Sequence, residues 1–576
     1  MIFESKLQIM ENTWQAFERN LSRLLMYEGY SEPRVVGQSG DHGADVIANK
    51  FGKRWLFQAK RWKKPVDTAV VQDTIKALQF YKADIPVIVS SNGFTNDVIS
   101  SQPKLIANGI KLQLWDSNTL ISKSRKLENK HVNIRVPRSY QESAIREIVS
   151  AYTLNARKAM IVMATGLGKT FVAAESIRRI RSFSKVPILV CAHMNDLVYQ
   201  LEKSFWPFLS PSEMTLIWNS NERPTYKQLE NADYVFACIA SVSTWLQAGN
   251  ELPEFGIILI DECHHVGASQ YERLFNATDA GQLGGPFALG LTATPFRADE
   301  IDLKTYFGTP RITIDMIRGL KEGFLTNVDY RMYTDNIDWK ALENLNGNSY
   351  TPKQINRTFF IQEWDDAVVY ELAKAWKEQA KPQVLVFCGN IEHALIMRDK
   401  LNALGFCKAA AVYSNSSDSI YEPQTQFQRN QILSDFSDGR INVVCAVDIF
   451  NEGIDVPDVN ILVFQRVTHS RRIFIQQLGR GLRIAPDKDK VIVLDFVSDI
   501  RRFAAGISLK DAIKPKKQAY TPRITINNKV TFRRVGGEDP KAESFLRQWL
   551  EDVAAIEAAD DNASVLKFPP KYDGDR

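Results

Sequence analysis

The feature that most restricts the possible folds is a series of short apolar runs that alternate with helical patterns from residue 135 onward. The first series comprises 159–163, 188–192, 234–239, 257–260 and 288–291, and the second comprises 384–387, 409–413, 443–447, 460–464 and 491–494. Continuous apolar runs of strand length, with helices between them, indicate parallel sheets that are buried on both faces. Because the pattern starts again at residue 384, we predict an α/β fold with two lobes in tandem.

The first 120 residues follow a different order, which predicts a separate α/β domain. An amphipathic helix is expected at 11–27, paired strands at 44–48 and 55–59, a second helix at 66–81 and a third strand at 86–90. With 576 residues the chain exceeds one core, because domains usually hold ~100–200 residues. We predict a first domain at 1–121, a linker at 122–134, one lobe at 135–330, a connecting segment and second lobe at 331–510, and an accessory tail at 511–576.

The composition is that of an ordinary globular protein, with 44% hydrophobic and 24% charged residues. No apolar run approaches the ~20 residues that span a bilayer, and residues 1–15 lack the apolar core of a signal peptide. We therefore expect a cytoplasmic protein with no membrane partner. The six cysteines form no CxxC pair, which argues against a zinc site, and four of them lie in apolar runs as expected for buried free thiols.

Positive charge is concentrated in two segments. Residues 1–130 hold 19 Lys and Arg against 13 Asp and Glu, and residues 511–537 hold seven against one. Basic segments are typical of phosphate contact, although a solvated surface explains the charge equally well. In the tail, the basic residues interleave with Tyr520 and Phe532, so this region is either a DNA-contacting strand pair or an extension packed on the second lobe.

A glycine-rich loop directly follows the apolar run 159–163 and precedes a helical pattern, which is the context that a phosphate-binding P-loop requires. Gly166 and Gly168, next to Thr165, allow backbone N–H groups to approach phosphates, and the helix dipole favours the anion. Lys169 would reach the β- and γ-phosphates of ATP, and Thr170 would bind Mg²⁺. The first glycine of the usual pattern is replaced by a methionine at position 163.

An acidic pair, Asp261 and Glu262, directly follows the apolar run 257–260. A carboxylate at the end of a buried strand is costly unless it meets a cation. Asp261 would hold Mg²⁺ through water, and Glu262 would orient and deprotonate the attacking water. An acidic helix cap is the plain alternative, but with a P-loop upstream we predict an ATP-hydrolysing site.

The sequence Asp-Glu-Cys-His after a P-loop resembles the superfamily 2 helicases, close to the restriction-enzyme motor branch. Further motifs follow in the family's order: 138–141 for adenine, 192–193 for nucleic acid, 291–295 for coupling, 384–390 for motif IV, 448–457 for motif V and 476–483 for motif VI. The resemblance implies nucleotide contacts from Arg138, Gln141, Gly453 and Asp455. It also implies that Gln476 touches the nucleotide or its water and that Arg480 and Arg483 are the candidates for the arginine finger.

The first domain carries a second constellation of polar residues. Asp45 starts one predicted strand, and Gln58 and Lys60 lie two apart on the next, so their side chains share a face. An acid, a second metal ligand and a lysine that converge at a strand pair are typical of metal-dependent phosphodiesterases, in which the metal activates water. Lys60 would position the water or stabilise the pentavalent charge. A surface ion pair between Asp45 and Lys60 is the plain alternative.

Together with residues 17–18, 39–48 and 92–95, this constellation resembles the Mrr-type restriction endonucleases of the PD-(D/E)xK superfamily. The resemblance implies that Glu18 is a further acid near the Mg²⁺ ion bound by Asp45 and Gln58. Gln58 stands where the usual motif has Glu, and its amide is a weaker, neutral ligand, although Mrr-type nucleases commonly carry it. Either an active nuclease or a retained fold used only for DNA contact is compatible with this difference.

Together the motifs predict an ATP-dependent DNA helicase or translocase coupled to a Mg²⁺-dependent DNA endonuclease, as in restriction or anti-phage defence. We found no Asn/Asp-Pro-Pro-Tyr/Phe motif of amino-methyltransferases, so partner proteins or DNA structure would supply target choice and self-protection. Duplex DNA is the expected partner. The alternatives are a repair or remodelling helicase whose nuclease-like domain only binds DNA, an RNA helicase, and a non-enzymatic scaffold.

Overall fold

The computed structural model describes residues 2–36, 44–127, 135–266, 269–293, 303–314, 318–319, 322–333, 362–413, 422–447, 459–465, 481, 484, 488–496, 523–526 and 530–535. The chain forms two compact units. The first comprises Met1–Ile161, Thr170–Leu291 and Lys304–Arg311, and the second comprises Val162–Lys169, Thr292–Leu303 and Ile312–Arg576.

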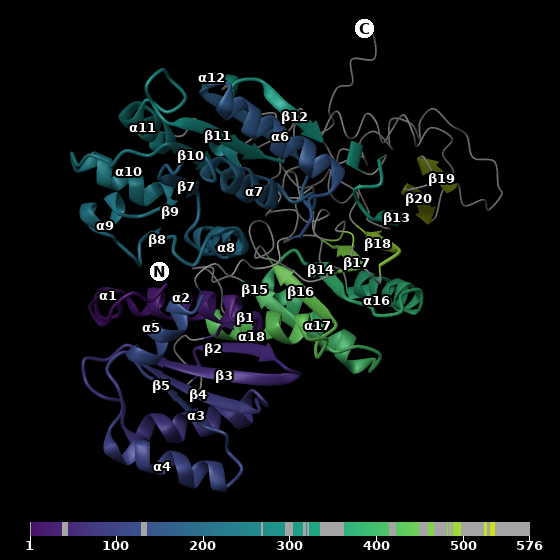
Figure 1. Ribbon diagram of the computed structural model, residues 1–576. Coiled ribbons are helices and arrows are strands. Elements are labelled where there is room, and N and C mark those ends of the chain that lie inside the picture. The colour runs from purple at the N-terminus through teal and green to yellow at the C-terminus, as the bar shows by residue number, and fades with distance from the viewer. Residues whose placement is uncertain are drawn as a thin grey trace, which may run out of the picture. The chain divides into compact units, whose positions relative to one another are not determined.

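The N-terminal domain is built on a five-stranded sheet in the order β1-β2-β3-β4-β5. Its strands are β1 (Ser31–Val35), β2 (Val46–Lys50), β3 (Lys53–Lys60), β4 (Ile85–Ser90) and β5 (Gln113–Trp115). The first three strands pair antiparallel, whereas β3, β4 and β5 pair parallel. Helices α1 (Lys6–Glu11), α2 (Trp14–Tyr27) and α5 (Ser117–Arg125) lie on one side of the sheet, and α3 (Thr68–Phe80) and α4 (Asn96–Ala107) on the other (Figure 1).

Two predicted boundaries in this domain are wrong. The first long helix begins at Trp14 rather than at residue 11, because the Thr13 side chain caps it by accepting from the Ala16 N–H. The predicted linker at 122–134 starts too early, since α5 continues to Arg125. Ser124 is buried and accepts a hydrogen bond of 3.3 Å from the backbone N–H of Phe3. Polar residues that make buried contacts look like linker residues in a sequence, and this explains the error.

The first lobe contains a seven-stranded sheet in the order β12-β6-β11-β10-β7-β9-β8. The strands are β6 (Lys158–Met163), β7 (Ile188–Ala192), β8 (Thr215–Trp218), β9 (Tyr234–Cys238), β10 (Ile257–Ile260), β11 (Phe287–Thr292) and β12 (Pro310–Ile314). The helices are α6 (Ser139–Thr153), α7 (Lys169–Arg181), α8 (Asn195–Phe205), α9 (Tyr226–Glu230), α10 (Ile239–Gln247), α11 (Ser269–Thr278) and α12 (Leu303–Phe307). Strands β7, β9, β10 and β11 are entirely buried, which explains their continuous apolar sequences.

The second lobe contains an eight-stranded sheet in the order β15-β16-β14-β17-β18-β13-β20-β19. The strands are β13 (Asn327–Tyr333), β14 (Val384–Phe387), β15 (Ala409–Tyr413), β16 (Val443–Val447), β17 (Ile461–Phe464), β18 (Lys490–Asp495), β19 (Arg523–Ile526) and β20 (Val530–Val535). All described pairs are parallel except β19 with β20. The prediction of two tandem lobes with parallel sheets is confirmed.

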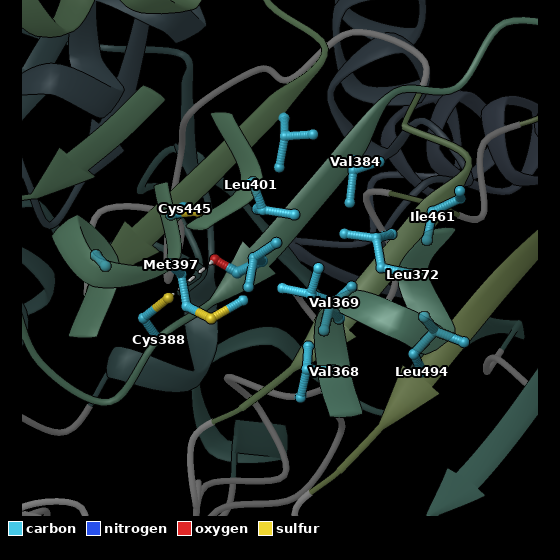
Figure 2. Packing of buried hydrophobic residues seen from close by; sticks show 14 of the residues in the cluster. Val368, Val369, Leu372, Val384, Cys388, Met397, Leu401, Cys445, Ile461 and Leu494 are labelled. Atoms are coloured by element: carbon cyan, nitrogen blue, oxygen red, sulfur yellow. Dashed lines mark hydrogen bonds between the residues drawn. The ribbon is translucent and has the colours of Figure 1, made fainter. Parts of the chain in front are cut away.

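Helices α16 (Gln362–Lys377), α17 (Ile391–Ala403) and α18 (Gln426–Ser437) accompany this second sheet. Figure 2 shows Leu372 of α16 and Met397 and Leu401 of α17 in the apolar cluster that also contains Val384 of β14. The predicted lobe boundary at 330–331 is wrong, because it falls inside β13, which pairs with β18 and β20. Strands β19 and β20 come from the predicted tail, so this part of it extends the sheet of the second lobe.

All six cysteines are buried and unpaired by disulfides, which confirms the prediction of buried free thiols. Within the described parts of the chain, no helix combines the length and the apolar character that crossing a membrane requires.

Candidate functional site

The glycine-rich loop adopts a backbone conformation that requires its two glycines. Gly166 and Gly168 have φ angles of 91° and 85°, a region that is strained for residues with side chains. Leu167 between them is fully buried, and its N–H donates to the Ala164 carbonyl oxygen (3.2 Å). Met163 is the last, buried residue of β6. The position of the missing first glycine therefore belongs to the strand, where no positive φ is needed.

The loop leads directly into the N-terminus of α7, whose first two residues are Lys169 and Thr170. The first N–H groups of a helix have no acceptor within that helix, and the helix dipole favours an anion there. The Thr165 hydroxyl is buried and has no hydrogen-bond partner among the described residues. A buried hydroxyl, a glycine turn and a helix N-terminus form an arrangement that suits a phosphate group.

The acidic pair follows β10, and only β11 separates this strand from β6 in the sheet. The backbone N–H of Asp261 donates to the Cys191 carbonyl oxygen (3.0 Å), which fixes the strand end to β7. Glu262 has φ 48° and ψ 53°, the left-handed conformation that non-glycine residues seldom adopt. Such backbone strain is concentrated at functional sites. The His264 Nδ1 atom lies 3.4 Å from a carboxylate oxygen of Glu262.

A cluster of three histidine rings in tilted contact lies beside this acid, and the sequence patterns did not predict it. The His193 ring, which follows β7, lies with its centroid 4.2 Å from that of His265. The centroids of His264 and His265 are 4.5 Å apart. This histidine cluster connects Glu262 with the strand end that is assigned to nucleic-acid contact. The doubled histidine after the acidic pair was its only signal in the sequence.

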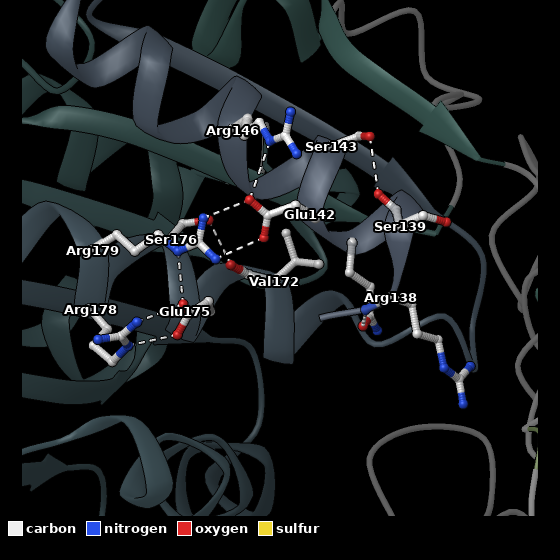
Figure 3. Close-up of polar contacts among 11 residues, drawn as sticks. Arg138, Ser139, Glu142, Ser143, Arg146, Val172, Glu175, Ser176, Arg178 and Arg179 are labelled. Atoms are coloured by element: carbon white, nitrogen blue, oxygen red, sulfur yellow. Dashed lines mark hydrogen bonds and ion pairs between the residues drawn. The ribbon is translucent and has the colours of Figure 1, made fainter. Parts of the chain in front are cut away.

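Helices α6 and α7, which carry predicted nucleotide contacts, are held together by a network of ion pairs (Figure 3). Arg179 of α7 donates to both carboxylate oxygens of Glu142 on α6 (2.9 and 2.8 Å) and to Glu175 (2.8 Å). The hydrogen bonds from Arg179 hold the pKa of the Glu142 carboxyl at about 2. At the start of α6, the Gln141 side-chain oxygen accepts from the Arg138 backbone N–H (3.0 Å). The network fixes the predicted adenine-reading segment on the P-loop helix.

The remaining predicted nucleotide contacts lie outside the described residues. These are Gly453, Asp455, Gln476, Arg480 and Arg483. Their assignments stay predictions.

In the N-terminal domain, the strand pair β2–β3 brings Asp45 and Lys60 together. The Asp45 carboxylate is buried, and one of its oxygens accepts from the Ala59 backbone N–H (2.6 Å) and lies 3.4 Å from Lys60 Nζ. Asp45 lies immediately before β2, and Lys60 lies at the end of β3. Both backbone and side-chain contacts thus join these two strand ends. Residues 37–43, which complete the predicted motif, lie outside the described chain.

Gln58 and Glu18 belong to opposite sides of the same sheet. Gln58 is buried and its side-chain oxygen accepts a hydrogen bond from Thr74 of α3. Glu18 is buried on α2, the helix that packs on the face formed by Phe57 and Ala59. Among the described residues, no group of three or more His, Cys, Asp or Glu side chains is placed to hold a metal ion. The oxygen atoms of Asp45 and Gln58 are nevertheless the ligand type that Mg²⁺ prefers.

The segment 92–95 supports the chain that follows Lys60. The Asn92 side chain donates to the Lys63 carbonyl oxygen (2.6 Å), and the Val66 N–H donates to the Gly93 carbonyl oxygen (3.0 Å). The backbone N–H of Thr95 returns a bond to the Val66 carbonyl oxygen (3.0 Å). These residues of the nuclease-like motif therefore have a structural role at the end of β3.

Three family models match the chain in succession. Residues 9–123 match a model described as restriction endonuclease, residues 135–297 one described as type III restriction enzyme, res subunit, and residues 365–485 the helicase conserved C-terminal domain. The protein therefore combines a restriction-endonuclease domain with the two domains of a helicase.

The chain is also similar to individual proteins over part of its length. The type I restriction enzyme EcoAI endonuclease subunit of Escherichia coli is 28% identical over 75% of this chain and 56% of its own length. The DNA 3'-5' translocase XPB2 of Sulfurisphaera tokodaii is 24% identical over 62% of this chain and 80% of its own. A solved structure of the ATP-dependent type ISP restriction-modification enzyme LlaBIII bound to DNA covers 97% of this chain and 43% of its own, at 16% identity and a TM-score of 0.48.

The chain is thus a homologue of the endonuclease subunits of type I restriction enzymes and of the superfamily 2 helicases, with an Mrr-type nuclease domain at its N-terminus. It spans little more than half the length of the type I subunit.

Proposed function

We propose that this protein is an ATP-driven DNA translocase that delivers or licenses cleavage by its own nuclease domain. The observation that carries the proposal is the strained acidic turn at Asp261 and Glu262, in the same sheet as a strand that leads into a P-loop with two left-handed glycines. The acidic turn and the P-loop occur in one chain with the Asp45–Lys60 pair, and together these features support an ATP-dependent activity on DNA.

In ATP hydrolysis, the loop N–H groups and Lys169 would bind the phosphates, while Thr170 and Asp261 would hold Mg²⁺. Glu262 would take a proton from the attacking water. Its left-handed backbone directs the carboxylate, and His264 lies 3.4 Å from one of its oxygens. Arg480 and Arg483 would supply positive charge at the transition state, and lobe closure would complete the site.

Glu18 lies on α2, across the sheet from the contact of Gln58 with Thr74, so its role as a further acid stays a prediction. Asp45 and Gln58 of the nuclease domain would hold a divalent cation, with Mg²⁺ as the expected ion. When bound, this ion supplies charge neutralisation at the scissile phosphate and a more acidic water. Lys60, which is 3.4 Å from Asp45, would hold the attacking water or the developing negative charge. The relatives in restriction enzymes support a role in restriction or anti-phage defence, with partner proteins for target choice.

Incubation with plain and modified duplexes, with and without ATP, tests this proposal. Lys169→Ala should abolish DNA-stimulated ATP hydrolysis, whereas Asp45→Asn should abolish Mg²⁺-dependent cleavage and leave ATP hydrolysis intact. Equal cleavage by wild type and Asp45→Asn would exclude the assigned nuclease site. ATP hydrolysis that responds to RNA but not to duplex DNA would exclude the DNA translocase.

A second function is favoured by one observation, the contact of Gln58 with Thr74 on α3. An amide that is already bonded within the domain is a weaker metal ligand, which fits a repair or remodelling helicase whose nuclease-like domain only grips DNA. In that case the wild-type protein binds DNA through residues 1–127 but cleaves no duplex in Mg²⁺, plain or modified. Calorimetric titration of Mg²⁺ into wild type and Asp45→Asn separates the two, because only an active nuclease site gives an Asp45-dependent binding signal.

A further inference from the structure

We infer that helix α2 is a fixed joint, by which the nuclease domain is docked on the first helicase lobe and moves with that lobe during the ATP cycle. The inference deepens the proposed function and rests on it for its mechanical meaning. It is carried by three side chains of α2, namely Arg19, Arg23 and Tyr27, which all bond to residues of the first lobe.

The strongest contact of this joint is made by Arg19. Its Nε donates to Glu202 of α8 (2.9 Å), and its two terminal nitrogens contact both carboxylate oxygens of Glu222. Glu222 also accepts from the hydroxyls of Thr13 (3.0 Å) and Tyr199 (3.2 Å). Burial opposes the charge on Arg19, but the two carboxylates more than offset this and raise its pKa. The guanidinium is therefore charged and buried between the nuclease domain and the lobe.

The other two side chains donate hydrogen bonds to the segment that follows the C-terminal end of α8. Tyr27 donates to the carbonyl oxygens of Trp206 (2.8 Å) and Leu209 (2.6 Å). Arg23 donates to that of Ser210 (2.8 Å). Both side chains thus bond to backbone carbonyl groups of the segment 206–210, which follows α8. Buried polar groups need such hydrogen-bond partners. The hydrogen bonds require one orientation of α2 relative to α8.

The sequence of α2 is adapted to two neighbours at once. Residues 19, 23 and 27 are spaced four apart and therefore lie on one side of the helix. Phe17, Leu21, Leu24 and Leu25 belong instead to the apolar core of the nuclease domain. Two arginines that are at most 9% exposed would be unusual in a domain that stood alone, because buried charges need partners. The partners are supplied by the first lobe.

The joint lies between two elements that the proposed function assigns to DNA. Helix α8 begins at Asn195, directly after the strand end at 192–193 with its predicted nucleic-acid contact, and its other end bonds to α2. On α2, the predicted nuclease residue Glu18 directly precedes Arg19. The joint would therefore keep the nuclease at a constant position relative to the DNA-contacting edge of this lobe, so that opening and closing of the lobes does not displace it.

Charge reversal in the full-length protein tests the joint. Arg19→Glu places three carboxylates together, and the double variant with Glu222→Arg restores one pair. Lys123→Glu is the matched control, because Lys123 pairs with Glu28 inside the nuclease domain. In calorimetry, we expect the nuclease domain and first lobe of the wild type and control to unfold in one transition, Arg19→Glu to split it, and the double variant to recover it. ATP-dependent cleavage by Arg19→Glu should fall on the order of 100-fold, as for a misplaced catalytic group, while DNA-stimulated ATP hydrolysis continues.

A single unfolding transition and a wild-type ratio of cleavage to ATP hydrolysis in Arg19→Glu would overturn the joint. If that variant does not fold, Arg23→Met combined with Tyr27→Phe removes the hydrogen bonds to the backbone of residues 206–210 without adding charge and should give the same two effects. If wild type neither hydrolyses ATP nor cuts DNA, the proposed function fails, while the calorimetric comparison still decides whether the joint exists.

Discussion

Replacing Arg179 by glutamine should loosen helix α6 from the P-loop helix α7 by a predictable amount. Arg179 bridges Glu142 on α6 and Glu175 on α7 with three hydrogen bonds of 2.8 to 2.9 Å. The variant leaves no orphaned charge, because Arg178 still pairs with Glu175 and Arg146 with Glu142. The cost should therefore exceed the ~0.2–1 kcal/mol of an exposed pair and stay below the ~3–5 kcal/mol of a broken buried one. We expect about 1–2 kcal/mol.

The control for this prediction is Arg146→Gln, which removes the other partner of Glu142. Arg146 is 75% exposed at the side chain, so its loss should cost less than about 0.5 kcal/mol. Thermal unfolding of the full chain measures both variants, with an expected shift of about 2–4 °C per kcal/mol for a lobe of this size. The Km for ATP should rise in Arg179→Gln only, because α6 carries the adenine-reading segment. Equal destabilisation by the two variants would refute the reasoning.

The same ion pair predicts a pH dependence. The hydrogen bonds from Arg179 lower the pKa of the Glu142 carboxyl from its ordinary value of 4.5 to about 2 in the folded protein. A lowered folded pKa means that the stabilisation is fully present above the unfolded pKa and is lost as the pH falls from about 4.5 towards 2. The stability difference between wild type and Arg179→Gln should therefore be constant near neutral pH and shrink below pH 4.5. A difference that grows on acidification would contradict this assignment.

Three further predictions concern the strained or buried positions of the lobes. Gly168→Ala forces a side chain onto a loop residue with φ 85°, which should cost about 1–2 kcal/mol and abolish ATP binding. The control is Gly405→Ala, at φ 71° but remote from the P-loop sequence, which should lower stability alone. Gly290→Ala would place a methyl group 2.7 Å from the Phe307 ring and 3.0 Å from the Cys263 sulfur, so we expect a loss of about 1–3 kcal/mol and slower ATP hydrolysis in a steady-state assay. Arg331→Met removes a buried partner of Asp329 and Glu378, but Lys490 still pairs with both, so the free energy of unfolding should fall by about 1–3 kcal/mol in a denaturant titration.

The buried strands could be predicted from the sequence almost residue by residue, because a parallel sheet covered on both faces leaves a continuous apolar run. The runs predicted at 188–192, 257–260 and 384–387 coincide with β7, β10 and β14. The P-loop and the acidic pair could be predicted equally well from the sequence, because their chemistry requires particular residues directly after a strand. What the sequence could not show is that Met163 ends the strand and that Glu262 has a left-handed backbone.

The errors have a common physical origin, which is that polar residues with partners resemble polar residues in water. Ser124 and Lys123 suggested a linker, yet the first accepts a buried hydrogen bond and the second pairs with Glu28. The two arginines of α2 likewise fit the solvent side of an amphipathic helix until their acceptors are known. These acceptors lie more than 180 residues away in the chain, as Arg19 and Glu202 illustrate. No local pattern can encode such a contact.

The joint connects residues that are far apart in the chain, and this is why it matters for function. A nuclease domain without these contacts would have no fixed orientation on the lobe, whereas the bonds from α2 to α8 and to the segment after it set one. The acceptors for Arg23 and Tyr27 are backbone carbonyls of residues 206–210, which substitution of a side chain cannot remove. The contacts of Arg23 and Tyr27 with these carbonyls can therefore be removed only by changes in α2 itself, next to Glu18. Separation of cleavage from ATP hydrolysis should accordingly arise from substitutions at positions 19, 23 and 27 more readily than from substitutions in the lobe.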